Sequence, residues 1–109
     1  MKSITAQIAQ KEGMIEVKAY ATRNPEFFIH KSVNRNGWTL SHTRTGYALF
    51  DGCRTREVAA IAAGWMDTIE GWETLTPDDT DTIKTFFKSN YDTLRAVRDY
   101  CWGVAPAPC

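Results

Sequence analysis

Two short turns that each end in glycine dominate the first half of this 109-residue chain. They occupy residues 34–37 and 43–46, and glycine at a turn's end can adopt the positive φ that other residues avoid. The flanking segments alternate between apolar and other residues, which is typical of β-strands. Pairing Val33 with Trp38, and His42 with Tyr47, makes both turns agree on one assignment of faces. One face then carries seven side chains: Phe27, Ile29, Val33, Trp38, Leu40, Tyr47 and Leu49.

The opposite face of this predicted sheet carries Phe28, His30, Ser32, Thr39, Ser41, Thr43 and Phe50. An antiparallel sheet can leave one face exposed, so we expect this face to be open or used for a partner. Phe28, His30 and Phe50 would then form a stacking platform or a protein-binding patch. The simpler alternative is that they cover an edge or meet the N-terminal strands.

The first 19 residues contain a second alternating pattern. Across a turn at residues 11–13, Ile8 faces Ile15, Ala6 faces Val17 and Ile4 faces Ala19, which places all six apolar side chains on one face. The spacing of Ile4 and Ile8 also fits a short helix over residues 3–11. We prefer the hairpin.

Helical periodicity replaces the alternation after residue 54. Thr55 is the expected N-cap of a helix that ends near Gly71. Alanines and Gly64 form a side of this helix with small side chains, which another element can approach closely. Its apolar stripe comprises Val58, Ile61, Ala62, Trp65 and Ile69. A second helix is expected to begin at Thr76 and Pro77 and to stop at Gly103. Its stripe comprises Ile83, Phe87, Tyr91, Leu94, Val97 and Cys101.

These patterns predict the α+β class: an antiparallel β-meander of three to five strands, packed on one face by two C-terminal helices. Residues 1–103 form a single domain, and residues 104–109 form an extended or mobile tail. No apolar run is long enough to cross a membrane, and the N-terminal residues lack the apolar region of a secretion signal. The three cysteines include no CxxC pair, so a reduced cytoplasmic setting is expected.

The charges are unevenly distributed although they sum to zero. Residues 23–56 hold six basic and two acidic side chains, whereas residues 57–109 hold four basic and nine acidic ones. The basic end suggests phosphate contact through Arg35, Arg44, Arg54 and Arg56. The acidic end suggests capture of a basic groove on another protein, through Asp67, Glu70, Glu73, Asp78, Asp79 and Asp81. Both groups also fit an ordinary solvated surface, with some of the acids serving a helix N-terminus.

Trp72 lies inside this acidic segment. Tryptophan is enriched in binding hot spots, so Trp72 is a candidate interface anchor, with a core contact as the alternative. No catalytic motif accompanies these surfaces. The two histidines are expected on opposite faces of the sheet, where they cannot share a metal, and Ser41 and His42 point apart as strand neighbours. We therefore expect no enzymatic activity, no cofactor and no metal.

Residues 37–46 form a Trp-containing strand and a Thr-Gly turn, and Arg54-Thr55-Arg56-Glu57-Val58 opens the helix. This stretch resembles the βββα core of small proteins carried by phages and plasmids, some of which inhibit host defence, anti-CRISPR proteins among them. Val58 stands where such proteins commonly have alanine. The resemblance covers roughly a third of the chain. It implies a non-enzymatic protein, acting in the cytoplasm of a host cell, that occupies the surface of a host protein or nucleoprotein complex.

The same core also resembles two nucleic-acid modules. One is the arm-binding domain of phage-type integrases, which reads DNA with a three-stranded sheet, and the other is the double-stranded-RNA-binding domain. Arg54 and Arg56 before the alanine-rich run resemble the basic helix start of the latter. The chain departs from both because it lacks a lysine run and has zero net charge. The alternative function is therefore nucleic-acid binding through the basic sheet end.

Overall fold

The structure of the protein is a computed structural model that describes residues 2–33, 35–104 and 106. Within these residues the strands precede the helices. The strands are β1 (Ser3–Gln10), β2 (Gly13–Ala21), β3 (Phe27–Lys31), β4 (Trp38–His42) and β5 (Ala48–Cys53). The helices are α1 (Arg56–Met66), the short 3-10 helix η1 (Trp72–Thr74), α2 (Thr80–Ser89) and α3 (Tyr91–Cys101).

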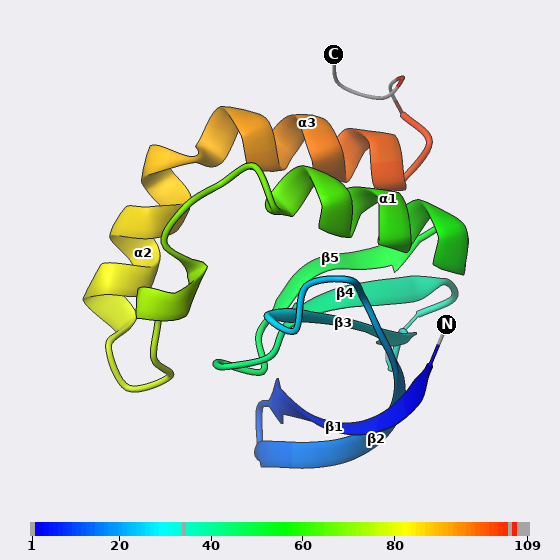
Figure 1. The fold of residues 1–109 in the computed structure, drawn as a ribbon, viewed down its shortest axis with the longest axis horizontal. Helices are drawn as coiled ribbons and strands as arrows, with labels where there is room; N and C mark the ends of the chain where they lie inside the picture. The colour runs from blue at the N-terminus through cyan, green and yellow to red at the C-terminus, as the bar shows by residue number, and fades with distance from the viewer. Residues whose placement is uncertain (1, 34, 105, 107–109) are drawn as a thin grey trace.

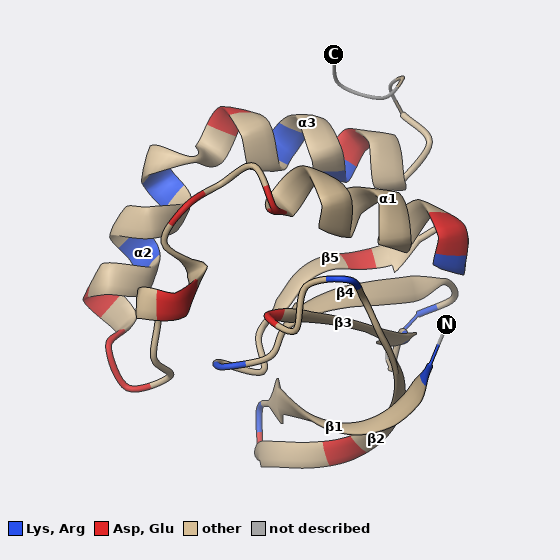
Figure 2. Cartoon of the chain, viewed as in Figure 1, with Lys and Arg blue, Asp and Glu red and all other residues tan. Residues whose placement is uncertain are grey.

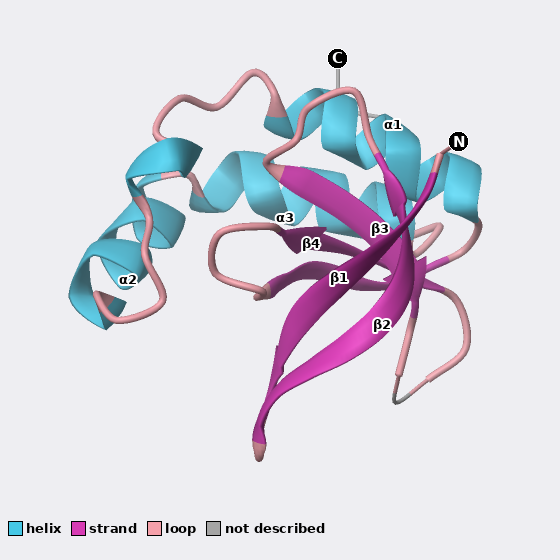
Figure 3. Ribbon diagram, turned by 60° about the horizontal axis from the view of Figure 1, so that its bottom comes forward, coloured by secondary structure: helices cyan, strands magenta, loops and turns pink. Residues whose placement is uncertain are grey.

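The sheet is an antiparallel meander in the order β1-β2-β3-β4-β5. Helices α1 and α3 lie together over one of its faces, while α2 extends beyond the sheet at one end (Figure 1). The α+β class and the meander predicted from the sequence are confirmed. The β1–β2 hairpin curls away from the other three strands, so the sheet is strongly bent (Figure 3).

The first hairpin has the predicted register. Ile8 pairs with Ile15, Ala6 with Val17 and Ile4 with Ala19, so the alternative of a helix over residues 3–11 is wrong. Only Tyr20 and Ala21 of β2 pair with β3, which leaves the rest of the hairpin free to bend.

The predicted pairing of Val33 with Trp38 is wrong. Trp38 pairs with Lys31 instead, and Val33 is exposed in the turn. The shift is two residues, which preserves the predicted faces because side chains alternate with a period of two. Gly37 has a φ of 107°, and a Cβ there would lie 2.6 Å from the Cys53 carbonyl oxygen, so this turn requires glycine.

Strand β5 carries additional residues relative to β4. Ser41 pairs with Ala48, as the sequence predicts, but Leu40 pairs with Phe50 instead of Leu49. This register shift is a β-bulge, which rotates the following residues to the other face. Phe50 therefore points toward the helices and is 3% exposed, so its predicted place on the opposite face is wrong.

The face opposite the helices is covered, contrary to our expectation. The curled hairpin packs Ile8 and Ala19 against Phe28, which is 1% exposed, and these residues form a second small core. The backbone N–H of Ala9 donates a hydrogen bond of 2.8 Å to the carbonyl of Gly46, which ties the hairpin to the β4–β5 turn.

The main core lies between the sheet and the helices. Thr55 caps α1 as predicted, because its Oγ1 accepts a hydrogen bond from the Val58 N–H. The predicted apolar stripe of α1 packs on the core except for Ile61, which is exposed, and part of the small-residue side is buried with it. Small side chains allow the helix to approach the sheet closely, and the buried residues are Ala59, Ala62, Ala63 and Met66.

The expected second helix is divided into α2 and α3. Asp79, instead of Thr76, is the N-cap of α2, and the helical run is interrupted at Asn90, whose side chain donates a hydrogen bond to the Phe86 carbonyl. The interruption leaves Tyr91 exposed although it belongs to the predicted stripe. Most of the predicted tail, residues 105 and 107–109, lies outside the described part of the chain.

Candidate nucleic-acid interface

Two half-buried aromatic side chains meet where α1 begins. Tyr20 stands near the end of β2, and Trp38 is the first residue of β4. Both project from the face of the sheet that carries the helices, because Tyr20 pairs with Ile29 and Trp38 is two residues before Leu40. Their ring centroids lie 6.0 Å apart in an edge-to-face arrangement.

Three cations surround these rings. The Arg56 guanidinium lies 4.9 Å from the Tyr20 centroid and 5.9 Å from the Trp38 centroid. The ammonium of Lys18 is 5.9 Å from the Tyr20 ring, and that of Lys31 is 5.8 Å from the Trp38 ring. At these distances a cation is attracted by the negative face of an aromatic ring. We call Lys18, Tyr20, Lys31, Trp38 and Arg56 the aromatic–basic platform.

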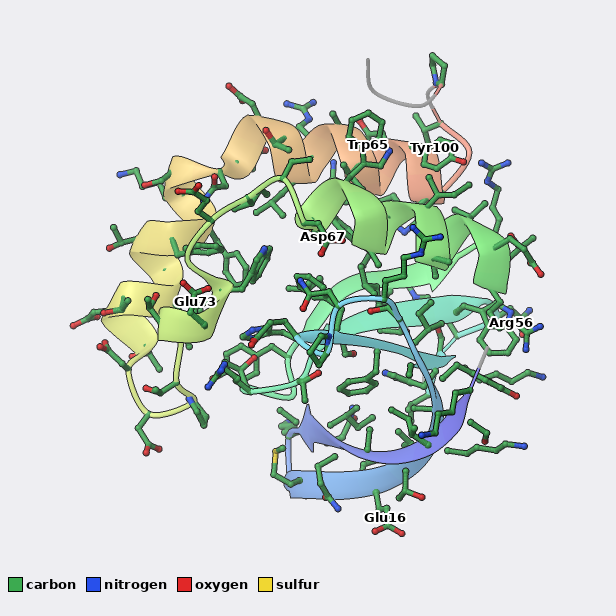
Figure 4. The ribbon with its side chains drawn as sticks, in the orientation of Figure 1. Glu16, Arg56, Trp65, Asp67, Glu73 and Tyr100 are labelled. Carbon is green, nitrogen blue, oxygen red and sulfur yellow. The ribbon has the colours of Figure 1, made fainter. Side chains whose placement is uncertain are left out.

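The platform surrounds a surface hollow of about 430 Å³, lined by four of its side chains and by Val17. An aromatic ring beside a hollow can stack on an unpaired base, and the adjacent cations can contact the phosphates that flank it. Arg56 is at the start of α1, at one end of the molecule, whereas Glu73 lies at the opposite end (Figure 4).

Two of the four predicted basic residues lie near this platform without belonging to it. Arg35 is in the turn between Lys31 and Trp38 and forms a 3.4 Å ion pair with Asp51. Arg54 follows β5, and its guanidinium donates to the Tyr100 carbonyl. The coloured charges of Figure 2 show basic residues at this end of the sheet.

Arg44 is not part of the basic end. It belongs to the β4–β5 turn, at the opposite end of β4 from Trp38, and its Nε donates to Glu26 at 3.0 Å. Of the four predicted nucleic-acid contacts, the structure places only Arg56 in the platform.

The residues predicted for an open sheet face are buried. Phe28 is in the second core, Phe50 is in the main core and His30 is 3% exposed, so none of them is an accessible contact surface. The Nε2 atom of His30 lies 3.0 Å from the Ser41 hydroxyl, and its Nδ1 lies 2.8 Å from the Lys31 carbonyl. Since Ser41 has no exposed surface, this contact is an internal hydrogen bond that fixes β3 against β4.

His42 lies on the other face of the sheet, as predicted, and packs against Trp72. Its ring nitrogens lie 3.0 Å from Thr45 Oγ1 and 3.2 Å from a carboxylate oxygen of Glu26. Burial lowers the pKa of His42, and the bond to Glu26 opposes that effect. Among the described residues, no three His, Cys, Asp or Glu side chains are grouped as metal ligands would be.

Trp72 is a core residue. It is 3% exposed, its rings meet Phe27 and Phe86 edge-on, and its indole N–H donates to the Met66 carbonyl at 2.9 Å. The prediction that Trp72 anchors an interface is therefore wrong, and its core alternative is confirmed.

The six predicted acidic residues are all exposed, but two have structural partners. Asp79 caps α2, and hydrogen bonds from the Thr82 N–H and hydroxyl hold the pKa of its carboxyl below the ordinary value. Asp67 accepts a 2.7 Å hydrogen bond from Asn24. No ion pair involving the remaining four is found in the described parts of the chain; they are Glu70, Glu73, Asp78 and Asp81.

Sequence reasoning missed Lys18, Tyr20 and Lys31, and it assigned Trp38 to the apolar face of the sheet without a binding role. Alternation along β2 places Lys18 and Tyr20 on one side of the hairpin, away from its apolar face, and this signal was available. The approach of Arg56, at the start of α1, to the Tyr20 ring was not available, because it depends on how far the hairpin bends.

Comparison with known proteins yields no match: neither a family model, nor a curated protein, nor a solved structure is similar to this chain. Within residues 2–33, 35–104 and 106, no helix combines the length and the apolar character needed to cross a bilayer.

Proposed function

We propose that the protein binds single-stranded nucleic acid with the aromatic–basic platform. The observation that carries this proposal is the Tyr20–Trp38 pair, with three cations within 6 Å of its rings. Aromatic rings stack on unpaired bases regardless of their sequence, and a cationic rim follows the backbone. This function belongs to the class predicted as the alternative, although Arg56 is the one platform residue among the predicted contacts.

We expect the platform to bind single strands more tightly than duplexes. The bases of a duplex are stacked on one another, so their faces are not available to Tyr20 or Trp38. Zero net charge means that attraction is local, and the few cations of the platform limit the number of phosphates contacted. We therefore expect a shallow dependence of affinity on salt, with a slope of about −0.7 for each phosphate contacted.

Fluorescence anisotropy tests this function with labelled oligothymidylate and oligouridylate of about twenty nucleotides, beside a duplex of equal length. We expect both single strands to bind more tightly than the duplex. Replacing Trp38 with leucine should weaken single-strand binding by about five- to 150-fold, which corresponds to the loss of one stacked base. No anisotropy change with either single strand at tens of micromolar protein would refute the function.

A charge-matched pair of variants tests the cations. The triple variant Lys18→Gln, Lys31→Gln, Arg56→Gln should bind weakly and show a smaller salt slope. The control variant Lys84→Gln, Lys88→Gln, Arg95→Gln removes three exposed cations from α2 and α3, outside the platform, and should bind like the unaltered protein. Equal losses in both variants would show that general charge, and not the platform, determines binding.

We also propose, as a second candidate, the inhibition of a host protein or nucleoprotein complex, consistent with the resemblance to phage-encoded proteins. The supporting observation is that Glu70, Glu73, Asp78 and Asp81 are exposed on the segment that leads into α2. A partner with a basic groove should be captured by the unaltered protein in a pull-down. Capture should be lost with Asp78→Lys and Asp81→Lys, but not with Asp92→Lys on α3. Equal capture by the unaltered protein, by the double variant at Asp78 and Asp81 and by the Asp92 variant would reject this candidate.

A further inference from the structure

A groove of about 590 Å³ runs beneath α1, and we call it the α1 groove. One wall is α1 itself, and the other is the start of the chain together with the end of β2 and the connection to β3. Its lining includes Lys2, Arg23 and Asn24 on one side and Ala60, Gly64 and Asp67 on the other.

The lining of the α1 groove follows residues of the aromatic–basic platform along two elements, β2 and α1. Ala21 directly follows Tyr20 on β2, and Ala60 lies about one helical turn after Arg56 on α1. Asp67 is at the far end of the same helix, and Figure 4 shows Arg56 and Asp67 at its two ends. Along α1 the lining of the groove runs from Ala60 to Asp67, about 10 Å at the rise of an α-helix, beyond the turn that carries Arg56.

The walls of the α1 groove suit a nucleic-acid strand. Ala60, Ala63 and Gly64 present no long side chain, so a base or sugar can approach the helix closely. Lys2 and Arg23 supply two cations on the facing wall, and no ion pair involving either is found among the described residues. The groove therefore adds two cations to the three of the aromatic–basic platform.

An acidic side chain, Asp67, lies at the end of the α1 groove, where α1 ends. Asp67 accepts a 2.7 Å hydrogen bond from the Asn24 amide nitrogen, and the Asn24 amide oxygen accepts a 2.9 Å hydrogen bond from the Glu26 N–H. Both ends of the Asn24 amide are therefore engaged, and Asn24 holds the Asp67 carboxylate in place. A carboxylate repels phosphate but accepts hydrogen bonds from base N–H groups through its remaining lone pairs.

We propose that the bound strand continues from the platform into the α1 groove, where Asp67 selects a guanine base. This inference rests on the proposed function. Guanine alone among the bases presents two adjacent donors, N1–H and the 2-amino group, which match the two oxygens of a carboxylate. Adenine and cytosine present one amino donor next to an acceptor nitrogen, and thymine presents one N–H between two acceptors, so all three fit less well.

Anisotropy titrations with oligothymidylate that contains one central guanine, inosine, adenine or cytosine test this selection. The guanine strand should bind about five- to 150-fold more tightly than unsubstituted oligothymidylate, the discrimination of one bidentate base contact. Inosine lacks the 2-amino group and should fall between guanine and adenine. Equal binding of all the strands would overturn the guanine site and leave the proposed function standing. Failure of every strand to bind would remove both.

Two variants separate the guanine preference from the general affinity for single strands. Asp67→Asn should lose the guanine preference and keep its affinity for oligothymidylate, whereas Asp92→Asn on α3 should change neither. Gly64→Leu places a larger side chain in the groove and leaves the Asp67 carboxylate present; a Cβ at Gly64 meets no atom within 4 Å, and the variant should also abolish the preference. A guanine preference that survives in both the Asp67 and the Gly64 variant would overturn the proposal.

Discussion

Trp72 meets Phe27 edge-on, with ring centroids 5.1 Å apart and planes at 86°, and this contact joins the linker after α1 to the start of β3. Trp72→Ala removes a large buried ring and leaves a cavity, so we expect the free energy of unfolding to fall by about 3–5 kcal/mol. Urea titration followed by circular dichroism measures the change. Glu73→Ala, at an exposed neighbour, is the control and should change stability by less than about 0.5 kcal/mol. A small effect at Trp72 would contradict its place in the core.

Two glycines give opposite predictions for the same substitution. Gly37→Ala forces a side chain into a positive φ and against the Cys53 carbonyl, so the free energy of unfolding should fall by more than about 1 kcal/mol. Gly64→Ala lies inside α1 with open space around it, so the free energy should rise by about 0.5–1 kcal/mol. Thermal and urea unfolding of both variants measure the difference. A stabilising Gly37→Ala would contradict the turn geometry.

Stability should fall as the solution becomes mildly acidic, in part through His30. Burial lowers the pKa of His30 below 6.5, and the Lys31 carbonyl and the charge of Asp51 oppose that effect only partly. Above about pH 6.5 both the folded and the unfolded states hold this ring neutral. Below that pH the unfolded state binds a proton first, so the free energy of unfolding decreases until the lowered pKa of the folded state is passed.

His30→Gln removes this titration. Urea midpoints measured from about pH 7.5 to 5.5 should fall less in the variant than in the unaltered protein, because His42 and the carboxylates remain in both. Parallel pH profiles would show that His30 titrates equally in the folded and unfolded states.

The two buried cysteines should resist alkylation in the folded protein. Cys53 and Cys101 have no exposed surface, and hydrogen bonding to Cys101 together with burial raises the pKa of the Cys53 thiol. The thiolate is the reactive form. In a Cys109→Ser background, labelling by iodoacetamide should be slower than in denaturant by a factor of about a thousand or more, as expected when reaction requires opening of the core. Rapid labelling under native conditions would contradict the burial.

The hairpin and the face assignments were predictable because they depend on a pattern of period two. The length of the turn at residues 11–13 fixes the pairing of Ile8 with Ile15. The predicted partner of Trp38 was wrong by two residues, but an error of two residues leaves each side chain on its predicted face. The error at Phe50 has a different origin. A bulge adds a residue to one strand only, and alternation along β5 alone does not show where β4 lacks a partner.

In the helices, too, the spacing of apolar residues does not reveal an irregularity of the backbone. A stripe of period 3.6 continues from Ile83 to Val97 across Asn90, so the interruption between α2 and α3 does not appear in the spacing of apolar residues. The candidate site was the least predictable feature. Its lysine and arginine residues are evident in the sequence. Lys18 and Arg56 meet at the Tyr20 ring only because the hairpin bends, and that bend is a property of the tertiary structure.

The hydrogen bond from Ala9 to Gly46 also constrains the order of assembly during translation. The hairpin of β1 and β2 leaves the ribosome first, yet Ile8 and Ala19 have no apolar surface to cover until Phe28 has been synthesised, and Ala9 has no acceptor until Gly46 has followed. The nascent hairpin is complete at Ala21, so it stays exposed to water while residues 22–46, a further 25 residues, are added. Slow synthesis through this stretch prolongs the exposure of an apolar strand pair to neighbouring chains.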